Sequence, residues 1–115
     1  MQQKSDSKTF LGKTVTVKMD RPLGSTHPDH GFTYTVNYGF IPGTVSGDGE
    51  EVDAYVLNVN TPLKMFTGTC AAIIRRKDED DDKLVVVPTG TTITNAEIER
   101  QTAFRESLFK HEIIR

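Results

Sequence analysis

Short runs of β-branched and apolar residues, separated by turn residues, constrain the fold of this chain more than any other feature. The runs predicted to form strands are Thr14–Met19, Val52–Leu57, Thr67–Arg75 and Leu84–Val87. One helix is predicted, from Asn95 to Phe109, because Thr94 and Glu97 have the spacing of a capping box. Several strands with one late helix favour a mainly β (α+β) fold, a small closed or partly closed barrel, over a βαβ sheet.

Glycine and proline divide the remaining segments. Residues 20–31 contain two of each, which predicts a loop. Aromatic and β-branched residues return between Phe32 and Val45, where two strands or one strongly bent strand are expected. Residues 112–115 are expected to leave the helix as a short extended tail. The apolar residues expected to pack the helix over one end of the sheet are Ile98, Ala103, Phe104, Leu108 and Phe109.

The size and composition of the chain limit its classes of function. With 115 residues it is long enough for one domain, 1–115, in which residues 1–9 are expected to be a flexible N-terminal tail. A net charge of −2 offers no basic surplus for a nucleic acid, and no apolar run approaches the roughly 20 residues of a membrane span. The polar start indicates no secretion signal, so we expect a cytoplasmic protein. The single cysteine, Cys70, lies in a small, apolar run and is interpreted as core.

Carboxylates gather on a predicted turn and on the strand that leaves it. Asp48, Glu50 and Asp53 can converge there, and converging carboxylates repel one another unless a cation lies between them. Hard divalent ions such as Mg²⁺ prefer oxygen ligands of this kind. For this segment alone, a solvated turn is an equally good interpretation.

A second acidic run, from Asp78 to Asp82, ends directly before Lys83. Taken alone, a solvated charge run is the better interpretation. Lys83 favours a functional interpretation of this run. The buried strand that follows would anchor Lys83, so that its ammonium can act as a counter-charge for phosphate. Strand alternation places one of Arg75 and Arg76 on the side of this site and the other on the opposite side.

Three blocks resemble the soluble inorganic pyrophosphatases. They are Tyr34–Pro42 (YTVNYGFIP), Asp48–Asp53 (DGEEVD) and Asp81–Pro88 (DDKLVVVP), the last two similar to the family signatures D-[SGDN]-D-[PE]-[LIVMF]-D and D-x-K-[LIVM]. The resemblance implies a small OB-like five-stranded β-barrel with a C-terminal α-helix. It also implies hydrolysis of inorganic pyrophosphate to two phosphates with Mg²⁺, for which Mn²⁺ can substitute, and it admits a homo-oligomer.

The resemblance also assigns residues. Asp48 and Asp81 would bind one metal, Asp53 would bridge two, and Asp78 would hold a further one. Lys83 would contact a phosphate and take part in catalysis. Glu50 occupies the position of the carboxylate that acts on the attacking water, Tyr38 would lie beside that water, and Tyr34 would line the site.

The chain departs from the family at three places. Glu50 is one methylene longer than the usual Asp, and a shift of about 1 Å can cost a hundredfold in rate. Between Met19 and Tyr34 there is no room for the family's basic hairpin, and no Tyr-Lys pair follows Pro88. Arg21, His27 and His30 are candidate substitutes for substrate binding, although exposed loop residues explain the histidines as well. Hydrolysis of an organic diphosphate, or a non-catalytic module that binds metal and phosphate, are the alternative functions.

Overall fold

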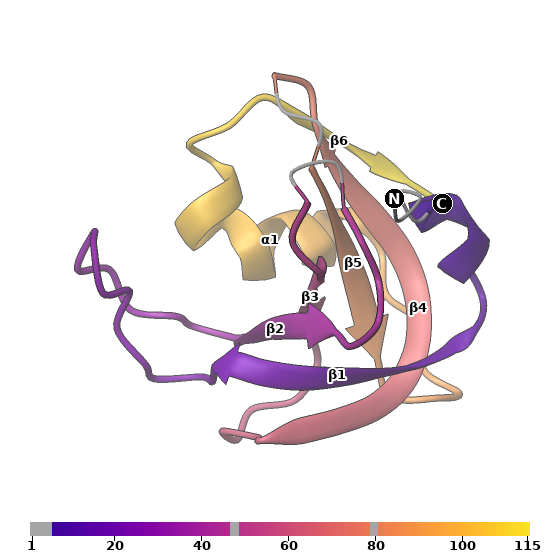
Figure 1. Cartoon of the computed structure of the whole chain (residues 1–115), viewed down its shortest axis with the longest axis horizontal. Coiled ribbons are helices and arrows are strands. Elements are labelled where there is room, and N and C mark those ends of the chain that lie inside the picture. The colour runs from indigo at the N-terminus through magenta and orange to yellow at the C-terminus, as the bar shows by residue number, and fades with distance from the viewer. Residues whose placement is uncertain (1–5, 47–48, 79–80) are drawn as a thin grey trace.

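The structure is a computed structural model, which describes residues 6–46, 49–78 and 81–115 (Figure 1). After a 3₁₀ helix, η1 (Ser7–Phe10), come five strands, one helix and a last strand. They are β1 (Thr14–Arg21), β2 (Asn37–Ile41), β3 (Val52–Val56), β4 (Met65–Arg76), β5 (Asp82–Val87), α1 (Asn95–Glu106) and β6 (His111–Ile114). No helix in the described ranges is long and apolar enough to span a membrane.

The first five strands close into a barrel in the order β1-β2-β3-β5-β4, because β4 also pairs with β1. Only β3 and β5 run parallel; the other pairs are antiparallel. The mainly β barrel with one helix is confirmed. Strand β4 is long enough to pair with three strands. Its first half pairs with β1, and its second half pairs with β5 and β6.

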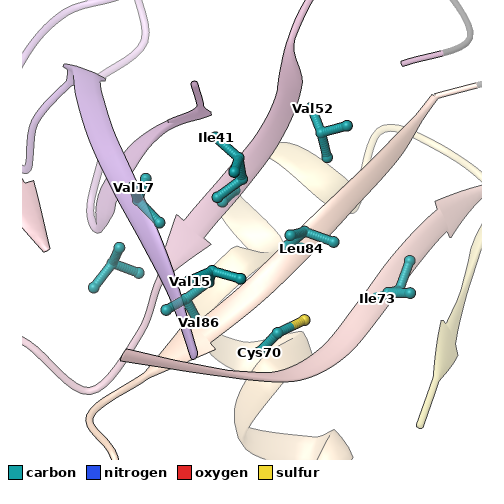
Figure 2. Close-up of a cluster of buried hydrophobic side chains, with 10 residues drawn as sticks. Val15, Val17, Ile41, Val52, Cys70, Ile73, Leu84 and Val86 are labelled. Carbon is teal, nitrogen blue, oxygen red and sulfur yellow. The ribbon is translucent and has the colours of Figure 1, made fainter. Parts of the chain in front are cut away.

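Two apolar clusters lie on opposite faces of the barrel wall. One fills the interior and includes Val17, Val52, Leu84 and Val86 (Figure 2). The other lies between the outer face and α1, and it includes Tyr55, Val85 and Ile98. Strands β3 and β5 are therefore buried on both faces, which explains why the run Leu84–Val87 is apolar without alternation.

Cys70 lies in the interior cluster and is fully buried. Burial raises the pKa of its thiol to about 11, so the sulfur stays protonated at neutral pH. The interpretation of Cys70 as a core residue is confirmed.

The helix begins as predicted, but it packs differently. The Thr94 side chain accepts a hydrogen bond from the Glu97 N–H, and the helix ends at Glu106 rather than Phe109. The predicted apolar stripe is wrong in part: Ala103 and Leu108 are exposed, and the buried residues are Ile98, Thr102 and Glu106. These follow one another at intervals of four, and hydrogen bonds satisfy the two polar members.

Three further segments differ from simple expectation. Between Phe32 and Val45, of the two alternatives, the structure has one strand, β2, and not two. Tyr34 makes its backbone hydrogen bonds to Gly24 and Ser25 of the loop instead. The expected C-terminal tail pairs with β4 as β6. A flexible tail was predicted over residues 1–9. The structure describes this segment from Asp6 onward, and there Asp6 caps the 3₁₀ helix η1.

Candidate metal and phosphate site

The parallel pairing of β3 with β5 places Asp53 directly beside Lys83. The Lys83 ammonium donates to an Asp53 oxygen at 2.8 Å and to an Asp81 oxygen at 2.6 Å. The Lys83 side chain is only 5% exposed, whereas those of Asp53 and Asp81 are 29% and 13% exposed. A buried cation thus lies between two carboxylates that solvent can reach.

Strand alternation places this site on the outer face of the barrel wall. Val52, Ala54 and Leu84 point into the interior cluster, so Asp53 and Lys83 point outward, toward the side of α1. The same alternation points the side chains of the neighbouring residues Asp81 and Asp82 to opposite faces of the sheet. Asp82 accepts two hydrogen bonds from the Arg75 guanidinium, at 3.0 and 2.9 Å, and is not a partner of Lys83.

The two tyrosines that the resemblance assigns to the site, Tyr38 and Tyr34, lie next to Asp53 and Lys83 or to each other. Tyr38 in β2 is opposite Tyr55 in β3, with ring centroids 4.8 Å apart, and Lys83 Nζ is 5.9 Å from the Tyr38 ring. Burial and the Asp53 charge raise the pKa of Tyr38 well above its ordinary value. Its phenol therefore stays protonated beside the carboxylate. The Tyr34 ring stacks beside Tyr38 at 5.5 Å.

The oxygen ligands available at this site are of the kind that Mg²⁺ binds. Asp53 and Asp81 already converge on one cation, the Lys83 ammonium, and Mg²⁺ commonly binds through one or two carboxylates while keeping several waters. Within the described ranges, no group of three or more His, Cys, Asp or Glu side chains could share a metal ion. Exposed Glu50 and Asp78 therefore do not complete such a group with Asp53 and Asp81. Asp48 lies outside the described residues.

A buried ion pair supports the site from the helix side, and the sequence did not indicate it. Arg76 donates to both Glu106 oxygens, at 3.0 and 2.7 Å, and the Tyr55 hydroxyl donates to Glu106 at 2.6 Å. Burial alone would raise the pKa of Glu106, but hydrogen bonds from Arg76 and Tyr55 bring it below its ordinary value. The available signal was the spacing of Glu106, eight residues after Ile98 on the buried helix face.

Asp20, near the end of β1, is another acidic residue that sequence reasoning missed. Burial raises its pKa, the Arg21 charge lowers it, and the charges of Asp53 and Glu51 add to the rise. Asp20 therefore lies within the field of the Asp53 carboxylate. No sequence motif marks it.

The predicted substitutes for the basic hairpin gather around Tyr34 rather than around Lys83. The His27 ring is 6.3 Å from the Tyr34 ring and 4.7 Å from that of His30. Arg21 donates to the Asp20 carbonyl. Burial raises the pKa of Tyr34, although the charges of Arg105 and Arg21 act to lower it. Burial and the charges of His30, Arg105 and Arg21 lower the pKa of His27. Arg105 of α1 joins this group although sequence reasoning did not select it.

Comparison with known proteins gives a consistent result. A family model described as inorganic pyrophosphatase matches residues 4–113. The inorganic pyrophosphatase of Rickettsia bellii is 38% identical over 85 residues, which cover 70% of this chain and 46% of the relative. That of Aeropyrum pernix is 37% identical over 83 residues, covering 69% and 44%. The chain thus spans a little under half the length of these curated relatives.

The fold is similar to those of solved structures. The crystal structure of inorganic pyrophosphatase from Ehrlichia chaffeensis matches with a TM-score of 0.67 at 18% identity, over 97% of this chain and 88% of that chain. The one from Thermus thermophilus matches with a TM-score of 0.61 at 18% identity, over 99% and 86%. At such low identity the likeness concerns the fold alone.

Proposed function

Because the chain belongs to the inorganic pyrophosphatase family, we propose that it hydrolyses inorganic pyrophosphate to two phosphates with Mg²⁺. The observation that carries the proposal is the convergence of Asp53 and Asp81 on one cationic position, beside a buried lysine that can face phosphate. The full activity is a proposal for this chain because it spans less than half of its relatives.

The residues of the site have separable roles in this proposal. Asp53 and Asp81 hold one metal, with Asp48 as a further proposed ligand, and Asp78 is proposed to hold a separate metal. Lys83 exchanges its carboxylate partners for phosphate oxygens and so offsets the charge of the substrate. When bound, Mg²⁺ lowers the pKa of a water molecule and stabilises the leaving phosphate.

The remaining proposed roles concern the attacking water and the substrate. Glu50 accepts a proton from the water, whose oxygen attacks one phosphorus while the bridging P–O bond breaks. Tyr38 lies beside the attacking water, and burial and the Asp53 charge keep its phenol protonated. Tyr34, Arg21, His27 and His30 contact the part of the substrate that lies farther from Lys83.

A non-catalytic module that binds metal and phosphate is the second candidate function. The Lys83 ammonium already balances the charge of Asp53 and Asp81, so these carboxylates do not need a metal for stability. Tight binding of a phosphate analogue without turnover would favour this candidate over the first.

The test is phosphate release from pyrophosphate by the purified protein with Mg²⁺ or Mn²⁺. We expect Asp53→Asn to lower the rate more than about 100-fold, since even partners of metal ligands cost about 10–100-fold when changed. The matched control is Asp82→Asn, the same change on a carboxylate that pairs with Arg75 and not with Lys83. This control should keep the wild-type rate.

Two outcomes would contradict the proposal. One is no phosphate release by the wild type with any divalent metal tried. The other is an equal loss of rate in both variants, which would indicate general damage to the fold rather than removal of a metal ligand.

A further inference from the structure

Aromatic side chains from two elements meet beside the proposed phosphate site. The loop over residues 22–34 contributes His27, Phe32 and Tyr34, and α1 contributes Phe104. The Phe32 ring lies 5.0 Å from that of His27, 5.2 Å from that of Tyr34 and 6.2 Å from that of Phe104. His27, Phe32 and Phe104 all keep part of their surface open to solvent. We call these four rings the aromatic cluster.

Basic side chains lie next to the aromatic cluster. The Arg105 guanidinium lies 5.0 Å from the centre of the Phe32 ring, within the range of a cation–π contact. Partial burial and the charges of His30, Arg105 and Arg21 lower the pKa of His27, and only Asp29 acts in the opposite direction. The cluster therefore combines aromatic surface with positive charge, whereas Asp53 and Asp81 make the neighbouring site acidic.

The aromatic cluster is continuous with the proposed phosphate site. Tyr34 belongs to the cluster and stacks on Tyr38 at 5.5 Å, and Tyr38 lies under the Lys83 ammonium at 5.9 Å. A ligand with phosphates at Lys83 and a flat group beyond Tyr34 can thus contact both regions. Inorganic pyrophosphate can reach Tyr34 with its second phosphate, but it has no flat group to place against Phe32 and Phe104.

We propose that the aromatic cluster and Arg105 bind the base of a nucleoside diphosphate whose phosphates occupy the site at Lys83. This inference rests on the proposed function, because it uses the same metal and phosphate site. Stacking of a base on an aromatic side chain is worth about 1–3 kcal/mol, which corresponds to roughly a 5- to 150-fold gain in affinity. Arg105 adds a charge near the α-phosphate and the base.

The test compares two non-hydrolysable ligands that share the same diphosphonate core. Adenosine α,β-methylene diphosphate carries a nucleoside, and methylenediphosphonate does not. With Mg²⁺ present, calorimetric titration of the full chain should give at least about a tenfold tighter dissociation constant for the nucleoside ligand. The difference should fall to less than about threefold in Phe32→Leu and in Arg105→Gln, and methylenediphosphonate binding should be unchanged in both.

Arg100→Gln is the matched control, because Arg100 is a second arginine of α1 that pairs with Glu97 on the exposed surface. It should keep the preference for the nucleoside ligand. If Phe32→Leu does not fold, the wild-type comparison and Arg105→Gln decide the result.

Each failure has its own meaning. Equal affinity for the two ligands, or a preference that survives Arg105→Gln, overturns this inference but leaves the proposed function standing as long as methylenediphosphonate binds. Absence of binding by both ligands overturns this inference and the phosphate site together.

Discussion

At the scale of single residues, Lys83 is the side chain on which the site depends. It is buried, yet its ammonium reaches two carboxylates that a metal would also need. The sequence suggested Lys83 as a counter-charge for phosphate, and the structure instead joins it to Asp53 and Asp81. The two arrangements are compatible if the lysine changes partners when a divalent ion and phosphate arrive.

Replacement of Lys83 by methionine tests this exchange. The variant leaves Asp53 and Asp81 without their shared cation, so we expect it to lose about 1–3 kcal/mol of unfolding free energy without metal. Mg²⁺ should then raise the melting temperature of Lys83→Met more than that of the wild type, since no ammonium competes for the carboxylates. Thermal unfolding with and without Mg²⁺ measures both effects, and an equal Mg²⁺ shift in the two proteins would refute the competition.

At the scale of elements, the attachment of α1 to the barrel depends on a buried ion pair as well as on apolar contact. Glu106 and Arg76 are 1% and 5% exposed, and the Tyr55 hydroxyl completes the hydrogen bonding of Glu106. Tyr55 in turn packs against Tyr38. The position of the helix and the shape of the proposed site are therefore linked through two tyrosine rings.

We expect Glu106→Gln to cost about 3–5 kcal/mol at neutral pH, since it removes the carboxylate that accepts two hydrogen bonds from the buried Arg76 guanidinium. The pKa of Glu106 is lowered in the folded state, so its contribution is full above the unfolded pKa of about 4.3 and is lost as pH falls through the folded pKa. The stability gap between wild type and variant should therefore close in acid. Denaturant unfolding at several pH values measures the gap.

Two further variants define what this result means. Glu97→Gln changes an exposed partner of Arg100 on the same helix, and it should lower the stability far less than Glu106→Gln does, because solvent screens an exposed ion pair. The double change Arg76→Met with Glu106→Leu should recover much of the loss, because apolar residues can replace a complete buried pair. A gap that stays constant down to acid pH would show that Glu106 acts through its shape and not through its charge.

The sequence predicted the elements whose pattern is local. Strand β1 alternates, β5 is a compact apolar run, and Thr94 has the correct spacing for a helix cap, and all three are confirmed. Strand β6 was missed because its pairing depends on the free edge of β4, which no local pattern describes. Glu106 was missed for a related reason: a carboxylate on a helix is usually solvated, and Arg76 and Tyr55, both distant in sequence, make its burial favourable.

At the scale of the whole molecule, barrel closure brings the motifs together. Residues 38, 53 and 83 lie in three different strands, and the β2-β3-β5 order makes these strands neighbours. The two signature blocks contain Asp53, Asp81 and Lys83, and the parallel register of β3 and β5 supplies the contact between Asp53 and Lys83. The basic residues that would hold the substrate were harder to predict, because α1 folds back to supply Arg105 from a segment without a motif.

The proposed function depends above all on a metal centre formed by Asp53 and Asp81, which acts on phosphate held by Lys83. Anomalous diffraction from crystals soaked with Mn²⁺ and methylenediphosphonate tests it most directly. We predict a manganese peak bonded to Asp53 and Asp81, with the Lys83 ammonium moved onto a phosphonate oxygen. Crystals that bind the ligand while Lys83 still joins both carboxylates, with no manganese between them, would contradict the claim.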